Sequence, residues 1–406
     1  MKYSDSRIYL STPHMNGHEM GYIQDAFDKN WIAPLGENVD GFENDLALYT
    51  GREHAAAVTS GTAAIHLALN LCDVEPGDQV ICQSFTFAAT ANPIRYQRAL
   101  PIFIDSEPGT WSMDPELLER AILDQLASRG GKKPKAIIYA HLYGMPAKVD
   151  QILQIAAKYE IPVIEDAAEA LGSSVNGQKC GTFGDLSVFS FNGNKIITTS
   201  GGGALLTDEE KIAEKARFLS TQARDEGPHY QHSELGYNYR MSNIVAGIGR
   251  GQMQVLDERV EARHENHRFY FEKLDGTWLN SENEAYTAFP TNGSTNGIYF
   301  LREPEGYRSN RWLTTILVNP EETGGVTRED IRLALEEENI ESRPLWKPMH
   351  LQPLYDGFPY YGRRVSDWLF ERGLCLPSGS NLSDEERERI VAVIKGVLRK
   401  EIVPIT

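Results

Sequence analysis

Lys195 and Asp166 are the two residues of this chain whose types and order could act together in catalysis. Asp166 ends the apolar run Pro162–Asp166, and Lys195 follows it along the chain in the segment Ser190–Lys195. A lysine amine forms a Schiff base with an aldehyde cofactor, and a buried carboxylate keeps a pyridine nitrogen protonated. The pair therefore predicts pyridoxal phosphate chemistry. Each residue alone has an ordinary explanation, a solvated lysine or an aspartate that caps a turn, so other segments must agree.

Three further features fit the same chemistry. The turn Ser60–Ala64 follows a predicted strand and opens a helix, where backbone amides and the Thr62 hydroxyl can hold a phosphate. An ordinary helix N-cap is the alternative explanation of this turn. Phe87 follows the next predicted strand, and its ring can stack on a flat heteroaromatic ligand unless it belongs to the core. Glu169 lies close behind Asp166, within reach of another polar group of the cofactor.

The elements that must position these residues alternate between short apolar runs and helical patterns from about residue 55 to 205. Such alternation predicts an α/β fold with a mostly parallel seven-stranded sheet in an α/β/α sandwich, followed by a smaller α+β domain. The expected domains are residues 1–250, which would bind the cofactor, and residues 251–406. The predicted strands are Ala56–Thr59, Gln79–Cys82, Leu100–Ile104, Ala136–Ala140, Pro162–Glu165, Leu186–Ser190 and Gly203–Thr207.

Helical spacing predicts a long helical stretch over 242–274, and Arg311–Val318 reads as a strand of the second domain. The segment Ser281–Tyr307, rich in Asn, Gly and Pro, is expected to be an irregular surface excursion. The other predicted helices are Ala63–Leu71, Pro115–Ser128, Val149–Tyr159, Thr327–Glu338 and Asp384–Arg399.

Composition excludes several classes of partner. The 406 residues include 57 acidic and 40 basic side chains, and the net charge of −17 argues against a nucleic-acid surface. The first residues lack the apolar core of a signal peptide, and no apolar stretch is long enough to span a membrane. The four cysteines are scattered without a CxxC pair, so we expect neither a disulfide framework nor a metal site. These features are typical of a cytoplasmic enzyme.

Taken together, the segments resemble the DegT-type nucleotide-sugar aminotransferases, within the fold type I pyridoxal phosphate enzymes. The resemblance covers nearly the whole chain, so it implies the fold type I architecture for the large and the small domain. It rests on the ordered segments Asn30–Gly36, SGTAA, SFTFAATAN, EDAAEALG, SFNGNK, GYNYRMSN and Arg343–His350.

This resemblance implies a role for each matching residue. Lys195 would form the Schiff base with pyridoxal 5'-phosphate and move the proton, and Asp166 would pair with the pyridine nitrogen. Phe87 would stack on the ring, and Glu169 falls where relatives often place Gln or His near the phenolic oxygen. The phosphate contacts would come from Gly61, Thr62, Ala63, Ser190 and, from the neighbouring subunit, Asn238. That last contact implies an obligate homodimer with two shared active sites.

The resemblance also implies the reaction. L-glutamate would give its amino group and leave as 2-oxoglutarate, and a nucleotide-linked keto sugar would accept it. The segment Ser190–Leu205 is most similar to enzymes that act at C4 of a UDP-linked 4-keto-6-deoxy-N-acetylhexosamine in bacterial glycan biosynthesis. The predicted substrate contacts are Trp31, Asn192, Arg240, Lys347 and His350, of which the last three have surface charges as their alternative explanation.

Three alternatives stay open at this point. A sugar dehydratase of the same fold uses pyridoxamine phosphate, but such relatives replace the Schiff-base lysine, typically by His, whereas Lys195 is present here. A non-catalytic cofactor-binding regulator would lack Lys195, Asp166 or a phosphate residue, or carry a fused module. An aminotransferase of this kind could also act on a dTDP- or GDP-linked sugar, or on a 3-keto sugar.

Overall fold

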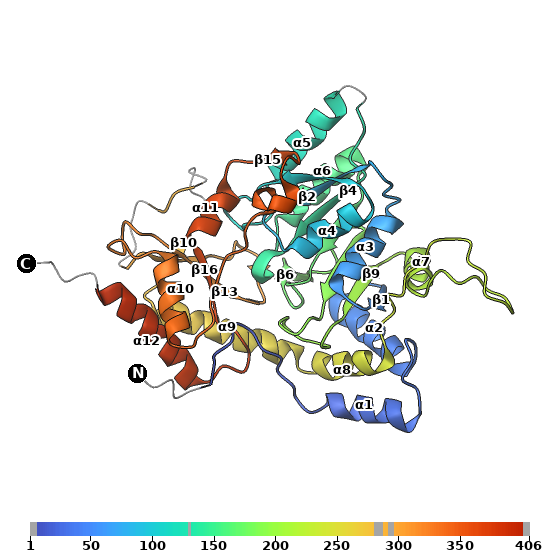
Figure 1. Cartoon of the computed structure of the whole chain (residues 1–406), viewed down its shortest axis with the longest axis horizontal. Helices are drawn as coiled ribbons and strands as arrows, with labels where there is room; N and C mark the ends of the chain where they lie inside the picture. Colours follow the sequence, from blue (N-terminus) through green and yellow to red (C-terminus); the bar gives the residue numbers. More distant parts are fainter. Residues whose placement is uncertain (1–5, 129–130, 280–286, 291–295, 401–406) are drawn as a thin grey trace, which may run out of the picture.

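In the computed structural model, which describes residues 6–128, 131–279, 287–290 and 296–400, a large mixed sheet forms the centre of the molecule (Figure 1). Its strands are β1 (His54–Val58), β2 (Gln79–Gln83), β3 (Leu100–Ile104), β4 (Ala136–Ala140), β5 (Val163–Asp166), β8 (Leu186–Ser190), β9 (Gly203–Thr207) and β15 (Tyr360–Tyr361). They lie in the order β1-β9-β8-β5-β4-β2-β3-β15. Only β9 runs antiparallel to its neighbours, so the sheet is mostly parallel, as predicted.

One strand more than the seven predicted belongs to this sheet. It is β15, which pairs in parallel with β3 so that Tyr360 lies opposite Phe103. A two-residue strand is too short to show a periodic pattern, which is why the sequence did not reveal it. The expected domain boundary after residue 250 falls inside α8 (Asn243–Met253), and β15 returns to the large sheet from beyond it. The division into domains therefore stays a prediction.

Helices cover both faces of the large sheet. Successive side chains of a strand point to opposite faces, so a strand of apolar residues needs to be buried on both sides. The two apolar layers contain neighbouring residues of the same strand, Ile137 in one and Ile138 in the other. Burial on both faces explains why the strands are continuous apolar runs. One layer packs against α2 (Glu37–Thr50), α5 (Pro115–Ala127) and α6 (Val149–Tyr159), and the other against α3 (Gly61–Leu71), α4 (Ala88–Tyr96) and α7 (Glu210–Ser220).

The C-terminal part is built on a second sheet in the order β10-β11-β13-β16-β14. Its strands are β10 (Thr277–Leu279), β11 (Ile298–Leu301), β13 (Thr314–Val318), β14 (Arg343–Pro344) and β16 (Gly373–Leu376). Apolar residues of this sheet pack against α9 (Leu256–Lys273), α10 (Arg328–Glu337) and α12 (Asp384–Lys400). The remaining elements are α1 (Glu19–Asp28), α11 (Val365–Arg372), the 3-10 turns η1 (Leu142–Gly144), η2 (Met349–Leu351) and η3 (Pro353–Tyr355), and the small sheet of β6 (Ser174–Val175), β7 (Gln178–Lys179) and β12 (Tyr307–Arg308).

Two predictions in this part need correction. The segment 281–307 is not irregular throughout, because Ile298–Leu301 forms β11, a buried apolar strand that pairs with β13. Residues 281–286 and 291–295 of that prediction lie outside the described residues. The helical stretch over 242–274 is divided into α8 and α9, with a break at Gln254 and Val255.

A shared apolar cluster joins the two parts of the molecule. Phe85 and Tyr143 lie beyond the carboxyl ends of β2 and β4, and they pack with Trp312, Leu345 and Cys375 from the C-terminal part. This packing brings Trp312 and the segment after β14 to the carboxyl edge of the large sheet. In the part of the chain that the structure describes, no helix is both long enough and apolar enough to cross a membrane.

Candidate active site

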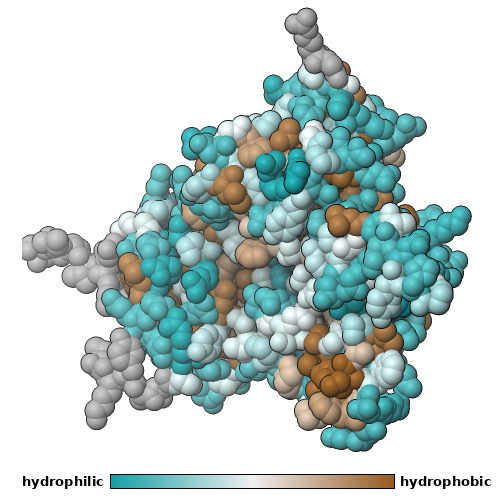
Figure 2. All heavy atoms as spheres, turned by 45° about the vertical axis from the view of Figure 1, so that its right-hand side comes forward, coloured by the Kyte–Doolittle hydropathy of each residue, from teal (hydrophilic) through white to brown (hydrophobic). Residues whose placement is uncertain are grey.

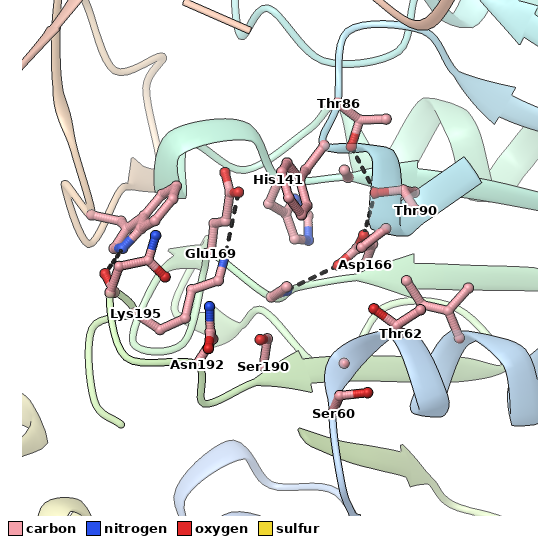
Figure 3. A pocket seen from close by; sticks show the side chains of 18 of the residues that line it. Ser60, Thr62, Thr86, Thr90, His141, Asp166, Glu169, Ser190, Asn192 and Lys195 are labelled. Atoms are coloured by element: carbon pink, nitrogen blue, oxygen red, sulfur yellow. Dashed lines mark hydrogen bonds and ion pairs between the residues drawn. The ribbon is translucent and has the colours of Figure 1, made fainter. Parts of the chain in front are cut away.

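The carboxyl ends of β1, β2, β4, β5 and β8 lie along one edge of the large sheet, the usual position of ligand sites in such folds. Asp166 ends β5, Ser190 ends β8, and α3 begins directly after the turn that follows β1. Side chains from these ends line a cavity of about 200 Å³ (Figure 3). The predicted site residues that line it are Gly61, Thr62, Phe87, Asp166, Glu169, Ser190, Asn192 and Lys195.

The Asp166 carboxylate is buried and held in one orientation. Its Oδ2 accepts a hydrogen bond of 2.7 Å from the Thr90 hydroxyl, and its Oδ1 accepts one of 3.1 Å from the Ala168 N–H. Thr90 in turn shares a hydrogen bond of 2.8 Å with Thr86. Burial raises the pKa of Asp166, although these hydrogen bonds and the nearby charge of Lys195 act in the opposite direction. A cation facing this carboxylate would therefore stabilise its charged form.

Lys195 points into the same cavity, on a different side from Asp166 (Figure 3). Its Nζ lies 3.4 Å from Oε1 of Glu169 and 4.2 Å from the centre of the Trp312 ring. The Trp312 Nε1–H donates a hydrogen bond of 2.8 Å to the carbonyl of Asn194, next to Lys195 in the chain. The side chain of Lys195 is only 11% exposed, so its amine is held in place and largely shielded from water.

The two carboxylate oxygens of Glu169 face different partners. Oε2 accepts a hydrogen bond of 2.7 Å from the N–H of Tyr143, while Oε1 faces Lys195. Burial raises the pKa of Glu169 to about 7, against the opposing effect of the Lys195 charge. This side chain therefore changes charge within the physiological pH range.

We expect a Glu169→Gln variant to reveal this titration in the cofactor-free protein. An acid whose folded pKa is raised contributes stability below its ordinary pKa of 4.5, and this contribution is lost as the pH rises to about 7. Gln does not titrate, so the free energy of unfolding of the variant, relative to wild type, should rise by about 2–3 kcal/mol between pH 5 and pH 8. Denaturant unfolding of both proteins at the two pH values measures this difference. A difference that is independent of pH would contradict the raised pKa.

The beginning of α3 offers donors for an anion. The first N–H groups of a helix have no partner within the helix and lie at its positive end, and here they belong to Gly61 and Thr62 at the cavity. A Cβ on Gly61 would lie 2.9 Å from Cβ of Ser190, so glycine is required for this close approach. The Ala63 N–H donates a hydrogen bond of 3.0 Å to Ser60 Oγ, and Ala63 is not among the residues that line the cavity, so its phosphate contact stays a prediction.

Four other predicted site residues are not among those that line the cavity. Arg240 forms a buried ion pair with Glu43, and Trp31 donates a hydrogen bond of 2.8 Å from Nε1 to the carbonyl of Leu35. Asn238 and Lys347 have exposed side chains. Their contacts with cofactor or substrate therefore stay predictions.

His350, the last predicted substrate contact, is held between protein groups. Its Nδ1 lies 2.7 Å from Ser84 Oγ, its Nε2 lies 2.9 Å from Asp367 Oδ1, and its ring stacks on Tyr360 with centroids 3.6 Å apart. Burial lowers the pKa of this histidine. The ring therefore connects the loop after β2 with the C-terminal part of the chain.

We expect the His350→Ala variant to lower the free energy of unfolding by about 2–4 kcal/mol. The substitution removes the imidazole partner of the Ser84 hydroxyl and of Asp367 Oδ1, which keep the backbone N–H of residue 350 and Arg364, respectively, and it removes an aromatic stack. Urea unfolding measures the change. A free energy of unfolding equal to that of wild type, combined with a raised KM for the acceptor, would instead indicate a substrate contact.

The structure adds cavity residues that were not predicted, namely Thr90, His141, Trp312 and Trp346. Thr90 and His141 each follow a predicted strand, so their position was a usable signal. Trp346 lies in the segment Arg343–His350, which carries the family resemblance and so offered a signal, whereas Trp312 reaches the cavity through long-range packing that leaves no local pattern.

His141 belongs to a buried group of metal-ligand types with Glu165 and Cys180. Its Nδ1 accepts a hydrogen bond of 2.9 Å from the Ala147 N–H, and its Nε2 lies 2.8 Å from Glu165 Oε1. The Glu165 carboxylate also accepts hydrogen bonds from two backbone N–H groups and from the Ser187 hydroxyl. Because these atoms are already engaged, the group is explained as a hydrogen-bond network that supports the end of β5.

The model of the DegT/DnrJ/EryC1/StrS aminotransferase family matches residues 13–395. The chain belongs to this family. It is therefore a pyridoxal phosphate-dependent sugar aminotransferase of nucleotide-sugar biosynthesis, and the predicted family, fold class, enzyme class and cofactor are confirmed.

Individual members of the family match over nearly their whole length. EpsN of Bacillus subtilis, whose name describes it provisionally as a pyridoxal phosphate-dependent aminotransferase, is 52% identical over 96% of this chain and 95% of its own. The GDP-perosamine synthase of Caulobacter vibrioides is 35% identical over 97% of this chain and 98% of its own. The crystal structure of a family member from Brucella abortus is 30% identical, has a TM-score of 0.83, and covers 94% of this chain and 96% of its own.

The residues of the cavity fit the family's cofactor. Lys195 offers an amine, Asp166 offers a buried carboxylate whose charged form a cation would stabilise, and the beginning of α3 offers N–H groups for a phosphate. When bound, pyridoxal phosphate supplies an electron sink and carries the amino group between two substrates.

Proposed function

We propose that this enzyme moves the amino group of L-glutamate to C4 of a nucleotide-linked 4-keto-6-deoxy sugar, for bacterial glycan biosynthesis. The first candidate acceptor is a UDP-linked 4-keto-6-deoxy-N-acetylhexosamine. The observation that carries the proposal is the cavity in which Lys195 and Asp166 face the same space. The four free cysteines are consistent with the cytoplasm as the place of the reaction.

The roles of the individual residues follow from their positions. Lys195 would hold the cofactor covalently and, once released, take the α-proton of the donor and deliver it again. Asp166, oriented by Thr90, would keep the ring nitrogen protonated. Phe87, which is 55% exposed, would stack on the ring. The phosphate would be held by Gly61, Thr62 and Ser190 at the start of α3 and the end of β8.

A homodimer with shared active sites is part of the proposal. Figure 2 shows an apolar patch on the lower part of the molecule, where α1 and α2 lie in Figure 1. Large apolar side chains of this region that stay about half exposed or more are Met20, Phe27, Trp31, Ile32 and Leu35. A contiguous exposed apolar surface is typical of a subunit interface. The exposed Asn238 would reach the partner's phosphate site, and Trp31 would meet substrate at this interface.

A GDP-linked acceptor is the second candidate. It is favoured by the GDP-perosamine synthases, three of which are 33–35% identical to this chain over at least 95% of its length. The nucleotide would then differ, whereas the donor and the roles of Lys195 and Asp166 would be the same.

Absorbance spectra of the holoenzyme test the proposal in two steps. Titration with L-glutamate should convert the long-wavelength band of the bound cofactor into a near-ultraviolet band, in wild type but not in Lys195→Ala. UDP-, dTDP- and GDP-linked 4-keto sugars are then added one at a time to the converted enzyme. Recovery of the original band with the UDP-linked sugar is the expected result.

The possible outcomes separate the alternatives. Recovery with the GDP-linked sugar alone would favour the second candidate and refute the first. If L-glutamate causes no conversion in an enzyme that carries the original band, the proposed donor is wrong.

A further inference from the structure

Arg263, on α9, is a buried cation that lacks an acidic partner in the part of the chain that the structure describes. Its side chain is 1% exposed, and the neighbouring charge that acts on it is that of Arg259, a second cation. Burial and this neighbour lower the pKa of Arg263 to about 9, so the guanidinium stays charged at neutral pH. A buried charge without an opposite charge is costly unless hydrogen bonds satisfy it. The acceptors that Arg263 reaches therefore explain its position.

The guanidinium reaches two segments that are distant from α9 in the sequence. Its Nη1 donates a hydrogen bond to the Trp312 carbonyl, and its Nη2 donates one of 3.0 Å to the Ser11 hydroxyl. Because a guanidinium is planar and rigid, these two bonds fix the positions of both acceptors relative to each other. Arg263 thus joins the N-terminal segment to the residues that precede β13.

Ser11 and Trp312 meet again at the residue before Lys195. The Ser11 hydroxyl and the Trp312 Nε1–H each donate a hydrogen bond of 2.8 Å to the carbonyl oxygen of Asn194. That carbonyl shares a planar peptide unit with the N–H and the Cα of Lys195, so holding the oxygen also orients Lys195. The Trp312 ring then faces the amine, with its centre 4.2 Å from Lys195 Nζ.

The backbone around Trp312 is held from both sides. Arg311, just before it, has a φ of +52°, which a residue other than glycine keeps only where its surroundings impose it. On the amino side the Trp312 N–H donates a hydrogen bond of 2.9 Å to Asn310 Oδ1, and on the carbonyl side Arg263 is the donor. The position of the indole ring beside Lys195 therefore depends on Arg263.

We propose that Arg263 is a positioning residue for the amine of Lys195. It acts through Ser11 and Trp312, which hold the peptide unit before Lys195 and one side of the amine. Arg263 itself is not among the residues that line the cofactor cavity, so its effect is indirect. The inference rests on the role that the proposed function gives to Lys195.

The test compares two arginines of the same helix. Arg259 lies one turn before Arg263 and is 8% exposed, but its Nη2 donates a hydrogen bond of 3.2 Å to the His14 carbonyl. Arg263→Lys keeps the charge and removes the planar fork that reaches two acceptors, and Arg259→Lys is the matched control. Ser11→Ala removes one donor to Asn194 at a partly exposed residue, so it should fold normally. Arg263→Lys and Ser11→Ala are the two test variants.

Hydrogen exchange of the cofactor-free proteins reports on this segment without any turnover. The Lys195 N–H donates a hydrogen bond of 3.0 Å to the Asn192 carbonyl, and loosening the segment opens this bond. We expect the peptide 192–200 to exchange about fivefold or more faster in both test variants, relative to the peptide of β4. A general loss of stability would speed the exchange of β4 as much, and the control should have the wild-type ratio.

Absorbance of the holoenzyme measures the consequence for catalysis. At saturating L-glutamate, the rate of conversion of the cofactor band should fall about 10–100-fold in Arg263→Lys, because a shift of about 1 Å in a reacting group can cost about 10²-fold. The L-glutamate concentration at half-maximal rate should stay within about twofold of wild type, since no substrate contact is removed. The control should match wild type in both values.

Each outcome decides between a positioning role and a structural one. Equal exchange ratios in wild type and in both test variants would refute the inference, and so would equal effects of the two Lys substitutions. A raised ratio with an unchanged rate of conversion would also refute it, because the amine would then not depend on the segment. If L-glutamate gives no conversion even in wild type, the proposed donor fails, and the exchange ratio alone decides the inference.

Discussion

The Lys195→Ala variant is expected to lose at least about 10⁴-fold in kcat. A positioned general acid or base alone contributes about 10²–10⁴-fold, and Lys195 would supply both the covalent link to the cofactor and the proton transfer. Its Nζ is also the amine that Glu169 and Trp312 hold in the cavity. Alanine leaves the walls of the cavity in place, so the variant should fold normally.

The measurement that isolates this role does not depend on turnover. Borohydride reduces a Schiff base to a stable secondary amine, so the pyridoxyl mass should appear on the peptide that contains Lys195. The label should be absent from Lys195→Ala and present at the wild-type level in Lys158→Ala, whose lysine is exposed on α6 and paired with Glu119. A label on another lysine of the wild-type protein would show that the catalytic amine has been misassigned.

The large sheet was predictable because each of its main strands is marked by a short apolar run in the local sequence. Strands such as Ala136–Ala140 and Leu100–Ile104 are short apolar runs whose bounds agree with the structure, since burial on both faces favours apolar residues at successive positions. The strand β11 was missed because it directly follows a stretch rich in Asn and Gly, and β15 because two residues show no period. Both depend on partners that are distant in the sequence.

The candidate site was predictable where a motif places the residue at the end of a strand. Asp166 and Ser190 end β5 and β8, and Gly61 begins α3. Charged residues were less informative, because a sequence does not reveal whether a ligand or the protein supplies the partner. Arg240 pairs with Glu43 and His350 with Asp367, both within the protein.

The Asp166→Asn variant is expected to reduce kcat by about 10²–10⁴-fold. Removing one partner of a buried charge pair costs about 3–5 kcal/mol, and about 1.36 kcal/mol corresponds to each tenfold in rate. Asn has nearly the same shape but cannot carry the charge that would hold a proton on the ring nitrogen. Steady-state kinetics with saturating cofactor measure the loss. A kcat within about tenfold of wild type would contradict this role of the charge.

Thermal unfolding of the same variant separates catalysis from folding. Burial raises the pKa of Asp166, so the stability that this side chain contributes in its protonated form at low pH is lost as the pH rises and the carboxylate becomes charged. Asn removes this cost and forfeits one of the hydrogen bonds from Thr90 and Ala168. We therefore expect the cofactor-free variant to have a Tm close to or above that of wild type, and the cofactor to raise its Tm much less. An equal loss of Tm with and without cofactor would show that Asp166 contributes to folding and not to cofactor binding. The expected pattern would show a carboxylate that costs stability in the free protein because its partner is the bound cofactor.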